Sequence, residues 1–374
     1  MKSIYLSLLL VVLSININCR NLLQASNCQD YTFLPTEDNV KLTGRTYKNR
    51  DETWIVHGGA AIEFYAWGNT CELLIVGDEG IYQEPDFRPR YAIYLDDKQI
   101  LDTTMNNLEF TLQFKISNDE NQKSKIKVMM LSEAQNGGVG IKQIKINSCA
   151  QNPKIIPVEK KKYSIEFIGD SITNAYGVDA PDQSHNFKTT TENFSKSYAY
   201  LAAQILDADY SSVSYSGHGI VSGYSSGDKW ADGVVPLYYT KISKNDKYPG
   251  DWDFEHHKYD VVLINLGTND ANYVNADREP RKDEFVFEYA SFLRTVRQKN
   301  PDSYILCTLG TLNPKDMYPL VVDAVKLFGG ERISVFESPV QDMNDGLGAD
   351  WHPSKITHEK LSKLVAEKIA EVLK

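Results

Sequence analysis

The chain has 374 residues, 42% of them hydrophobic and 24% charged, which is typical of a folded globular protein and argues against a disordered or membrane-embedded chain. A formal net charge of -10 leaves no basic field for a phosphate backbone, so nucleic acid is not an expected partner. The length favours two domains, because single cores tend to divide beyond about 250–300 residues.

The N-terminus begins with a short basic segment, residues 1–3, which is followed by an apolar run over residues 4–15. This arrangement is typical of a signal peptide. The alternative, a membrane anchor, is disfavoured because the run is shorter than the roughly 20 apolar residues that cross a bilayer. We therefore expect residues 1–25 to be a signal peptide, cleaved after Cys19 or Ala25, and the mature protein to be secreted and free of the membrane.

Four further cysteines would then meet an oxidising compartment. Cys28, Cys71 and Cys149 fall in the first half of the chain, and we expect one disulfide among them, with its connectivity open. Cys307 lies inside the apolar run 304–309 and is expected to be a buried thiol.

Short apolar or alternating runs follow one another from residue 40 to about residue 147, separated by turn pairs such as Gly58-Gly59 and Gly137-Gly138. Close spacing with almost no helical period predicts an all-β sandwich, which we place at residues 26–150. The expected strands are 54–56, 61–67, 73–76, 91–95, 110–114, 126–131 and 141–146.

Residues 151–162 contain two prolines and a run of lysines, which predicts an exposed linker. Beyond it, apolar strands alternate with helix-length segments, which predicts an α/β domain at residues 163–374 with a parallel sheet and helices on both faces. The expected strands are 164–168, 210–215, 260–266, 303–309 and 333–336, and the expected helices are 197–206, 283–299, 318–328 and 354–373.

The loops after these strands hold the residues that acyl transfer needs, at the carboxyl ends where α/β proteins place reactive groups. Ser171 follows the strand 164–168 directly, where its hydroxyl can act as a nucleophile. His352 precedes the last helix and can act as general base. Gly217 and Asn269 follow two further strands, and they offer a main-chain N–H and a side-chain amide to a developing oxyanion, beside the N–H of Ser171.

These residues lie in four ordered blocks: 169–173 (GDSIT), 216–219 (SGHG), 267–270 (GTND) and 350–353 (DWHP). The blocks resemble those of the GDSL/SGNH hydrolases, and their order is more specific than any one block. With the β domain and the segments 235–238 (VPLY) and 252–254 (WDF), the whole chain resembles carbohydrate esterase family 2. That family joins an N-terminal jelly roll to an SGNH domain and removes acetyl groups from plant-wall polysaccharides.

The resemblance implies that Ser171 is the nucleophile, that His352 is the base, and that the oxyanion hole combines the Ser171 and Gly217 N–H groups with the Asn269 amide. It implies an esterase that acts on an acetylated polysaccharide or oligosaccharide such as acetylated xylan or glucomannan, and we expect this esterase to be a secreted monomer without a cofactor. Two alternatives stay open: an SGNH esterase or lipase acting on other acyl esters, and a carbohydrate-binding protein with an inactive esterase domain.

SGNH enzymes usually carry an aspartate three residues before the histidine, and that position is Ala349 here. Members of the resembled family work with a Ser–His dyad whose imidazole is oriented by main-chain carbonyls. We therefore expect a dyad, and the alternative is that Asp350 supports His352.

Three other residues in the blocks are candidates for support or substrate binding. Trp351 resembles the family's cleft tryptophan, which stacks on a sugar ring, and its alternative role is that of a core aromatic. Asp170 adjoins the nucleophile, and His218 either lines the pocket or has a structural role.

Several other motifs match a functional pattern, but we do not expect them to form a catalytic or metal site. Residues 223–227 (GYSSG) match the G-x-S-x-G pattern, but they follow no strand, so we expect a loop. His256 and His257 have no second metal-ligand pair at usable spacing, so no metal site is expected. His358 lies within the last helix and is expected to be solvated.

Overall fold

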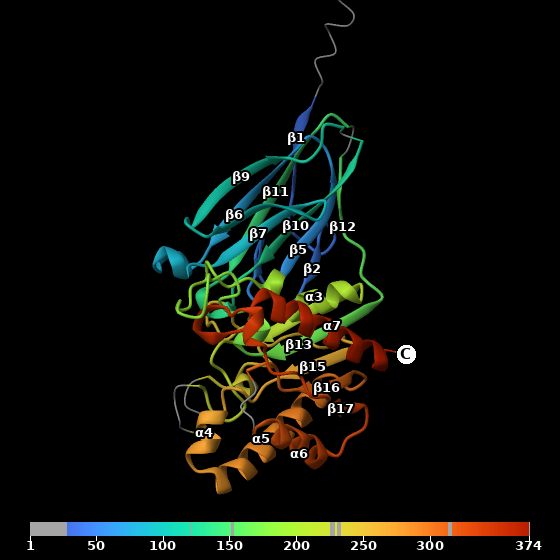
Figure 1. Ribbon diagram of the computed structural model, residues 1–374. Coiled ribbons are helices and arrows are strands. Elements are labelled where there is room, and N and C mark those ends of the chain that lie inside the picture. The colour runs from blue at the N-terminus through green and yellow to red at the C-terminus, as the bar shows by residue number, and fades with distance from the viewer. Residues whose placement is uncertain are drawn as a thin grey trace, which may run out of the picture.

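The computed structural model describes residues 28–119, 121–150, 153–224, 229, 233–312 and 316–373. The expected signal peptide lies outside these residues, as does most of the segment 223–227. An N-terminal β sandwich stands above a C-terminal α/β domain (Figure 1).

The sandwich consists of two antiparallel sheets of six strands each. The first has the order β3-β4-β11-β6-β9, with β1 also paired to β11, and the second has the order β12-β5-β10-β7-β8, with β2 also paired to β5. The strands are β1 (Gln29–Phe33), β2 (Lys41–Thr43), β3 (Thr46–Asn49), β4 (Glu52–Ile55), β5 (Ala61–Trp67), β6 (Thr70–Gly77), β7 (Arg90–Leu95), β8 (Lys98–Thr104), β9 (Glu109–Lys115), β10 (Lys123–Met130), β11 (Val139–Ser148) and β12 (Ile155–Pro157).

Strand β10 shows why one sheet of the sandwich is buried on both faces. Val128 and Met130 point into the core between the two sheets. Met129 points the other way, into a cluster that also contains residues of the α/β domain. Because side chains alternate across a strand, a continuous apolar run is needed where both faces are covered.

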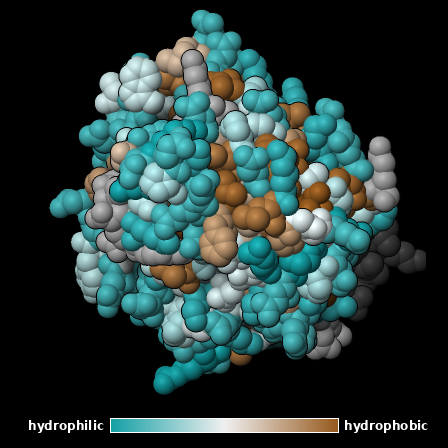
Figure 2. All heavy atoms as spheres, turned by 90° about the horizontal axis from the view of Figure 1, so that it is seen from below, coloured by the Kyte–Doolittle hydropathy of each residue, from teal (hydrophilic) through white to brown (hydrophobic). Residues whose placement is uncertain are grey.

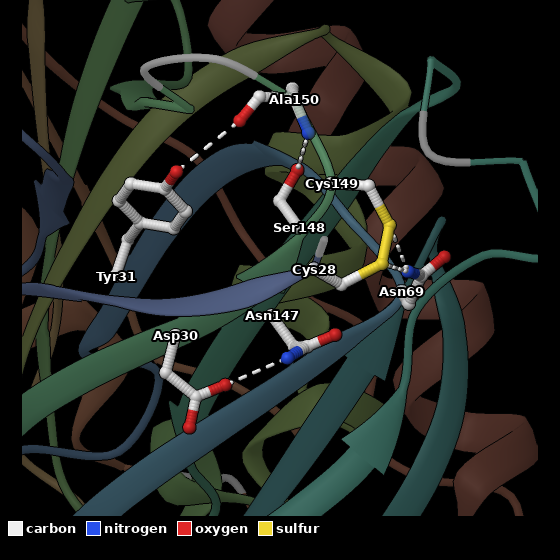
Figure 3. The surroundings of a disulfide bond; sticks show 8 residues. All are labelled: Cys28, Asp30, Tyr31, Asn69, Asn147, Ser148, Cys149 and Ala150. Carbon is white, nitrogen blue, oxygen red and sulfur yellow. Dashed lines mark hydrogen bonds between the residues drawn. A yellow bond between two sulfur atoms is a disulfide. The ribbon is translucent and has the colours of Figure 1, made fainter. Parts of the chain in front are cut away.

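The disulfide expected in this domain joins Cys28 to Cys149. It connects the start of β1 to the end of β11, where the two strands pair, and the amide of Asn69 lies against both sulfur atoms (Figure 3). Cys71 and Cys307 are buried free thiols, as expected for Cys307.

The segment predicted as a linker contributes a strand to the sandwich. Strand β12 lies within it and pairs with β5, and Ile155 at its start is buried in the sandwich core. The prediction of a linker over this stretch is therefore wrong for residues 155–157, because two isoleucines can complete a sheet edge next to a proline. Lys160, Lys161 and Lys162 are exposed.

The α/β domain has a parallel sheet of five strands in the order β14-β13-β15-β16-β17, with helices on both faces, as predicted. Helices α3 and α7 cover the face toward the sandwich, and α4, α5 and α6 lie on the opposite side (Figure 1). The strands are β13 (Tyr163–Gly169), β14 (Ala208–Ser214), β15 (Val261–Asn265), β16 (Tyr304–Thr308) and β17 (Ile333–Val335), and the helices are α2 (Ser171–Asn174), α3 (Tyr198–Ile205), α4 (Ala271–Ala276), α5 (Arg278–Lys299), α6 (Tyr318–Phe328) and α7 (Lys355–Val372).

A buried ion pair joins the two domains. Arg45, in the turn between β2 and β3, is fully buried and its guanidinium donates to the carboxylate of Glu166 on β13 at 3.0 Å. It also donates to the main-chain oxygens of Tyr239 and Lys241 in the α/β domain. The sandwich is therefore anchored inside the core of the second domain.

The far end of the α/β domain, seen from below in Figure 2, is mostly hydrophilic, with a group of apolar residues near the middle of the view. Among the helices of the described residues, none has the length and hydropathy that a membrane span requires.

Candidate active site

Ser171 lies at the turn from β13 into the short helix α2. Asp170 caps this helix, and its carboxylate accepts the N–H of Ile172 at 3.0 Å. A side chain at Gly169 would clash with Thr173, so the strand can turn this sharply only at a glycine. The turn places the Ser171 hydroxyl beyond the carboxyl end of the strand.

His352 is hydrogen-bonded to Ser171, the expected nucleophile. Its Nε2 lies 2.9 Å from the Ser171 Oγ, and its Nδ1 lies 3.1 Å from the main-chain oxygen of Ala349. The N–H of Ala349 in turn donates to the carbonyl of Gly177, which fixes the loop that presents the acceptor. A carbonyl acceptor at Nδ1 requires a proton there, which leaves Nε2 free to accept the serine proton.

Burial lowers the pKa of His352 to about 4. The carbonyls of Ala349 and Asp350, and the charge of Asp350, act in the opposite direction but more weakly. The imidazole is therefore neutral near pH 7, which is the state that a general base requires.

The carboxylate of Asp350 bonds other groups than the imidazole. Its Oδ2 accepts the hydroxyl of Tyr176 at 2.6 Å and the N–H of Phe187 at 3.0 Å. Asp350 and Trp351 both have left-handed backbone conformations, with φ of 48° and 67°, which turn the Asp350 side chain away from the base. The Tyr176 ring itself stacks on His352, with ring centroids 4.0 Å apart.

Two main-chain donors of the expected oxyanion hole have no partner within the part of the chain that the structure describes: the N–H groups of Ser171 and Gly217. Gly217 has a φ of +76°, and no atom lies within 4 Å of where a Cβ would stand. The protein therefore leaves open space beside Gly217, on the side where other residues carry a side chain.

The Asn269 amide lies between the first two blocks. Its Nδ2 donates to the carboxylate of Asp170 at 3.2 Å and to the main-chain oxygen of His218 at 2.9 Å. These bonds bring three of the four blocks together, and His352 brings the fourth to Ser171.

Asp170 and His218 are both buried. Burial raises the pKa of Asp170 to about 7, and the nearby charge of Asp270 adds to the shift. The His218 ring bonds to the main-chain oxygen of Ser216 through Nδ1 at 2.9 Å and to the ammonium of Lys244 through Nε2 at 2.7 Å. His218 therefore ties the second block to the loop that carries Lys244.

Trp351 has 56% of its surface exposed, so the alternative of a core aromatic is wrong. Its main-chain oxygen accepts the side-chain amide of Gln341 at 2.9 Å, which helps to hold the loop beside the base. The exposed indole remains a candidate for stacking on a sugar ring.

Three further residues contribute to the candidate active site, and the sequence patterns considered above predict no role for them. Tyr176 is a lone aromatic in a loop, and Glu133 lies in the sandwich, 83 residues from its partner Ser216. Asp270 belongs to the third block, and its carboxylate accepts the N–H groups of residues 220–222, which fold the loop after the second block. The position of Asp270 directly after Asn269 could have suggested such a role.

His358 is buried, so the expectation of a solvated histidine is wrong. Its Nδ1 accepts the N–H of Tyr198, and the face of α7 that carries it packs on α3. His256 is exposed and bonds Asp253. Within the described residues, no group of three or more His, Cys, Asp or Glu side chains could hold a metal ion.

Comparisons with known proteins point to an ester hydrolase. A family model described as the GDSL-like lipase/acylhydrolase family matches residues 167–360, which include all four blocks. The chain is 35% identical over 226 residues to the cellulase/esterase CelE of Acetivibrio thermocellus, a match that covers 58% of this chain and 26% of that protein. It is 30% identical over 224 residues to an acetylxylan esterase/glucomannan deacetylase of Cellvibrio japonicus, covering 57% of this chain and 60% of that protein.

The matches to these two relatives thus span less than two thirds of their length. A further match described as acetylxylan esterase/glucomannan deacetylase, also from Cellvibrio japonicus, is 23% identical and covers 95% of this chain and 94% of the relative.

Solved structures share the whole fold. An acetyl xylan esterase from the rumen bacterium Butyrivibrio proteoclasticus superposes with a TM-score of 0.81 at 20% identity, covering 92% of this chain and 99% of the other. A family two carbohydrate esterase from Clostridium thermocellum, solved in complex with cellohexaose, superposes with a TM-score of 0.76 at 24% identity, covering 89% and 99%. Both therefore combine a β sandwich with an α/β domain in the same arrangement.

Proposed function

The chain belongs to the GDSL-like lipase/acylhydrolase family, and from this premise we propose that it is a secreted serine esterase that removes O-acetyl groups from plant cell-wall polysaccharides. The observation that carries the proposal is the Ser171–His352 pair, with 2.9 Å between Oγ and Nε2 and a main-chain carbonyl behind the imidazole. This arrangement prepares a serine hydroxyl for acyl transfer.

The proposed reaction proceeds through an acyl-enzyme. Ser171 Oγ attacks the acetyl carbonyl carbon while His352 Nε2 takes the hydroxyl proton. The N–H groups of Ser171 and Gly217 stabilise the oxyanion, and the Asn269 amide joins them by exchanging its longer bond, to Asp170, for one to the oxyanion. Collapse of the tetrahedral intermediate breaks the bond to the sugar oxygen, which leaves with the proton from His352. Water then attacks the acetyl-serine with His352 as base, which releases acetate and restores the hydroxyl.

The named relatives support a polysaccharide substrate, with acetylated xylan or glucomannan as the proposed polymer. The exposed indole of Trp351, directly before the base in the chain, supports contact with a sugar ring. The signal-like pattern of residues 1–25 and the Cys28–Cys149 disulfide support secretion. We propose that the protein acts as a monomer.

Hydrolysis of p-nitrophenyl acetate by the purified protein tests the reaction. We expect Ser171→Ala to abolish turnover with the fold intact and His352→Ala to fall nearly as far, because the two act as a unit. Asn269→Ala should lower kcat about a hundredfold, as expected for one lost oxyanion donor. Ser291→Ala, on the distant helix α5, is the matched control and should behave as wild type. Retention of a tenth of the wild-type rate in Ser171→Ala would contradict the assignment.

The substrate is tested by NMR analysis of the products from acetylated xylan and acetylated glucomannan. Release of acetate from one of these polymers supports the proposal and identifies the hydroxyl position. Hydrolysis of longer acyl esters but not of either polymer would favour the alternative of a lipase-like esterase. An inactive wild type that still binds the polymers would favour the carbohydrate-binding alternative.

A further inference from the structure

One carboxylate of the sandwich reaches the candidate active site. Glu133 lies in the turn between β10 and β11 and is only 2% exposed. Its Oε2 accepts the N–H of Ser216 at 2.7 Å, directly before Gly217 in the chain. The same oxygen accepts the side-chain amides of Asn174 at 3.2 Å and Gln135 at 3.0 Å.

We propose that Glu133 is a positioning residue of the oxyanion hole, supplied to the α/β domain by the sandwich. This inference rests on the proposed esterase function, because it assigns Glu133 a role in the geometry of the same site.

The peptide between Ser216 and Gly217 sets the direction of the Gly217 N–H. A trans peptide is planar, so the Gly217 N–H points opposite to the Ser216 carbonyl. That carbonyl accepts the Nδ1 proton of His218 at 2.9 Å and the side-chain amide of Gln135 at 3.3 Å. Since Glu133 holds the Ser216 N–H and also Gln135, the sandwich fixes both main-chain polar groups of Ser216. The direction of the Gly217 N–H follows from theirs.

Asn174 is the last residue of α2, the helix that begins at Ser171. Asn174 donates to Glu133 through Nδ2 and accepts the hydroxyl of Ser214 at 2.6 Å through Oδ1. Glu133 therefore connects the helix that carries the Ser171 N–H with the loop that carries the Gly217 N–H. The two main-chain donors of the oxyanion hole are held in register by one carboxylate.

Glu133 is itself held in place by hydrogen bonds along its turn. Its N–H donates to the carboxylate of Glu192 at 3.0 Å, and the turn continues to Gly138, whose N–H donates to Asp78 at 2.9 Å. The Tyr248 hydroxyl also donates to Asp78. The turn is thus tied to the α/β domain directly at Glu133, and at Gly138 through Asp78 of the sandwich, so the carboxylate is presented by a fixed element.

The test is steady-state kinetics on p-nitrophenyl acetate with Glu133→Ala and Glu133→Gln. Displacing a reacting group by about 1 Å costs on the order of a hundredfold, so we expect Glu133→Ala to lower kcat about ten- to a hundredfold with KM changed less than about threefold. Glu133→Gln keeps an acceptor oxygen for the Ser216 N–H, so it should retain kcat within about tenfold of wild type.

Glu63 provides the matched control, because it is a buried glutamate of the same sandwich that bonds Thr43 and lies in β5. Glu63→Ala should lower stability and leave kcat unchanged. Combining Glu133→Ala with Asn269→Ala should cost less than the product of the two single effects, because both act on one oxyanion hole.

If Glu133→Ala keeps kcat within about threefold of wild type while Ser171→Ala is inactive, the inference is wrong and the proposed esterase function stands. If wild type itself hydrolyses no ester, the proposed function fails first. If Glu133→Ala does not fold, Gln135→Ala decides: this residue is exposed, and its truncation should lower kcat several-fold without changing KM. An unchanged kcat in Gln135→Ala would then overturn the inference.

Discussion

Asp350 is the carboxylate nearest to His352 in the sequence, but its side chain bonds other residues. Asp350 receives the Tyr176 hydroxyl and the Phe187 N–H, and the ring of Tyr176 stacks on His352. The Asp350 side chain therefore contacts His352 through a neighbouring ring, while the Ala349 carbonyl sets the tautomer of the imidazole. A neutral carbonyl stabilises an imidazolium less than a carboxylate does, but it fixes the direction of the ring equally well.

We expect Asp350→Asn to lower kcat less than about tenfold, far below the roughly ten-thousandfold loss seen when a triad aspartate is neutralised. The asparagine oxygen can still accept one of the two donors, so the ring of Tyr176 keeps its place. Turnover of p-nitrophenyl acetate measures the effect, with His352→Ala as the reference for complete loss. A drop near ten-thousandfold would show that Asp350 takes the acid's role.

The pH profile of kcat/KM reports the state of His352. Because its pKa is lowered to about 4, the imidazole is a neutral base above that pH and is protonated below it. We expect kcat/KM to hold between about pH 5 and 7 and then to fall tenfold per pH unit below pH 4. Any change near pH 7 should vanish in Asp170→Asn, because burial raises the pKa of Asp170 to about 7. A fall centred near pH 6.5 in both proteins would contradict the shift.

Sequence reasoning places the residues that lie inside the four blocks, because each block carries its own local pattern. It cannot place Glu133, whose partner Ser216 is distant in the chain, and it misjudged His358. His358 is buried because α3 covers the face of α7 that carries it, and the sequence of α7 alone does not indicate which of its faces is covered. The sequence also does not predict the left-handed backbone conformation of Asp350, because aspartate adopts a positive φ only in special contexts.

At the scale of elements, the predicted strands of the sandwich correspond to β4–β7 and β9–β11, and all predicted strands and helices of the α/β domain are present. The strands without a prediction are short or polar. Strand β8, for example, runs along an edge with mostly exposed side chains, and β1 is largely exposed. Pairing with a neighbouring strand stabilises such strands, and the local pattern of apolar residues does not predict that pairing.

We expect loss of the Cys28–Cys149 disulfide to lower the free energy of unfolding by about 2–4 kcal/mol, because the bond closes a large loop in the unfolded chain. The bond spans 121 residues of sequence and lies where β1 begins, at the far end of the sandwich from the α/β domain (Figure 1). Urea unfolding of a Cys28→Ser, Cys149→Ser double variant measures the change, and kcat should stay at the wild-type value. Dithiothreitol should reproduce the effect in wild type and have none in the variant. Equal unfolding energies in all four samples would contradict the prediction.

At the scale of the whole molecule, the interface between the domains consists of buried, mostly apolar side chains, as the core of a single domain does. One apolar cluster contains Ala61 and Met129 of the sandwich together with Phe194 and Tyr198 of the α/β domain. Arg45 crosses this boundary with its charge fully enclosed, and rings of Tyr239, Trp252 and Phe254 surround the guanidinium. Burial at this interface couples the stability of one domain to that of the other.

We expect Arg45→Ala to lower the free energy of unfolding by about 3–5 kcal/mol, because it leaves the Glu166 carboxylate buried without its counter-charge. Glu166→Gln should cost less, because the Arg45 guanidinium that it leaves without a counter-charge still donates to the main-chain oxygens of Tyr239 and Lys241. Chemical denaturation followed by circular dichroism measures both. The exposed pair Lys142–Glu109 supplies the control, and Lys142→Ala should change stability by less than about 1 kcal/mol. An Arg45→Ala variant as stable as this control would disprove the coupling.

The buried Arg45 also limits how such proteins can be recombined. A sandwich grafted from another enzyme would have to bring an arginine to the same turn, or else leave Glu166 as an uncompensated charge inside the recipient. A chimera cut at the segment before β13 would therefore fold poorly even when each half comes from a stable parent. Transferring the Arg45 turn and β13 together should restore folding of the chimera, because both partners of the ion pair then come from the same parent. The unit that must be kept intact in recombination is therefore the contact between the domains and not either domain alone.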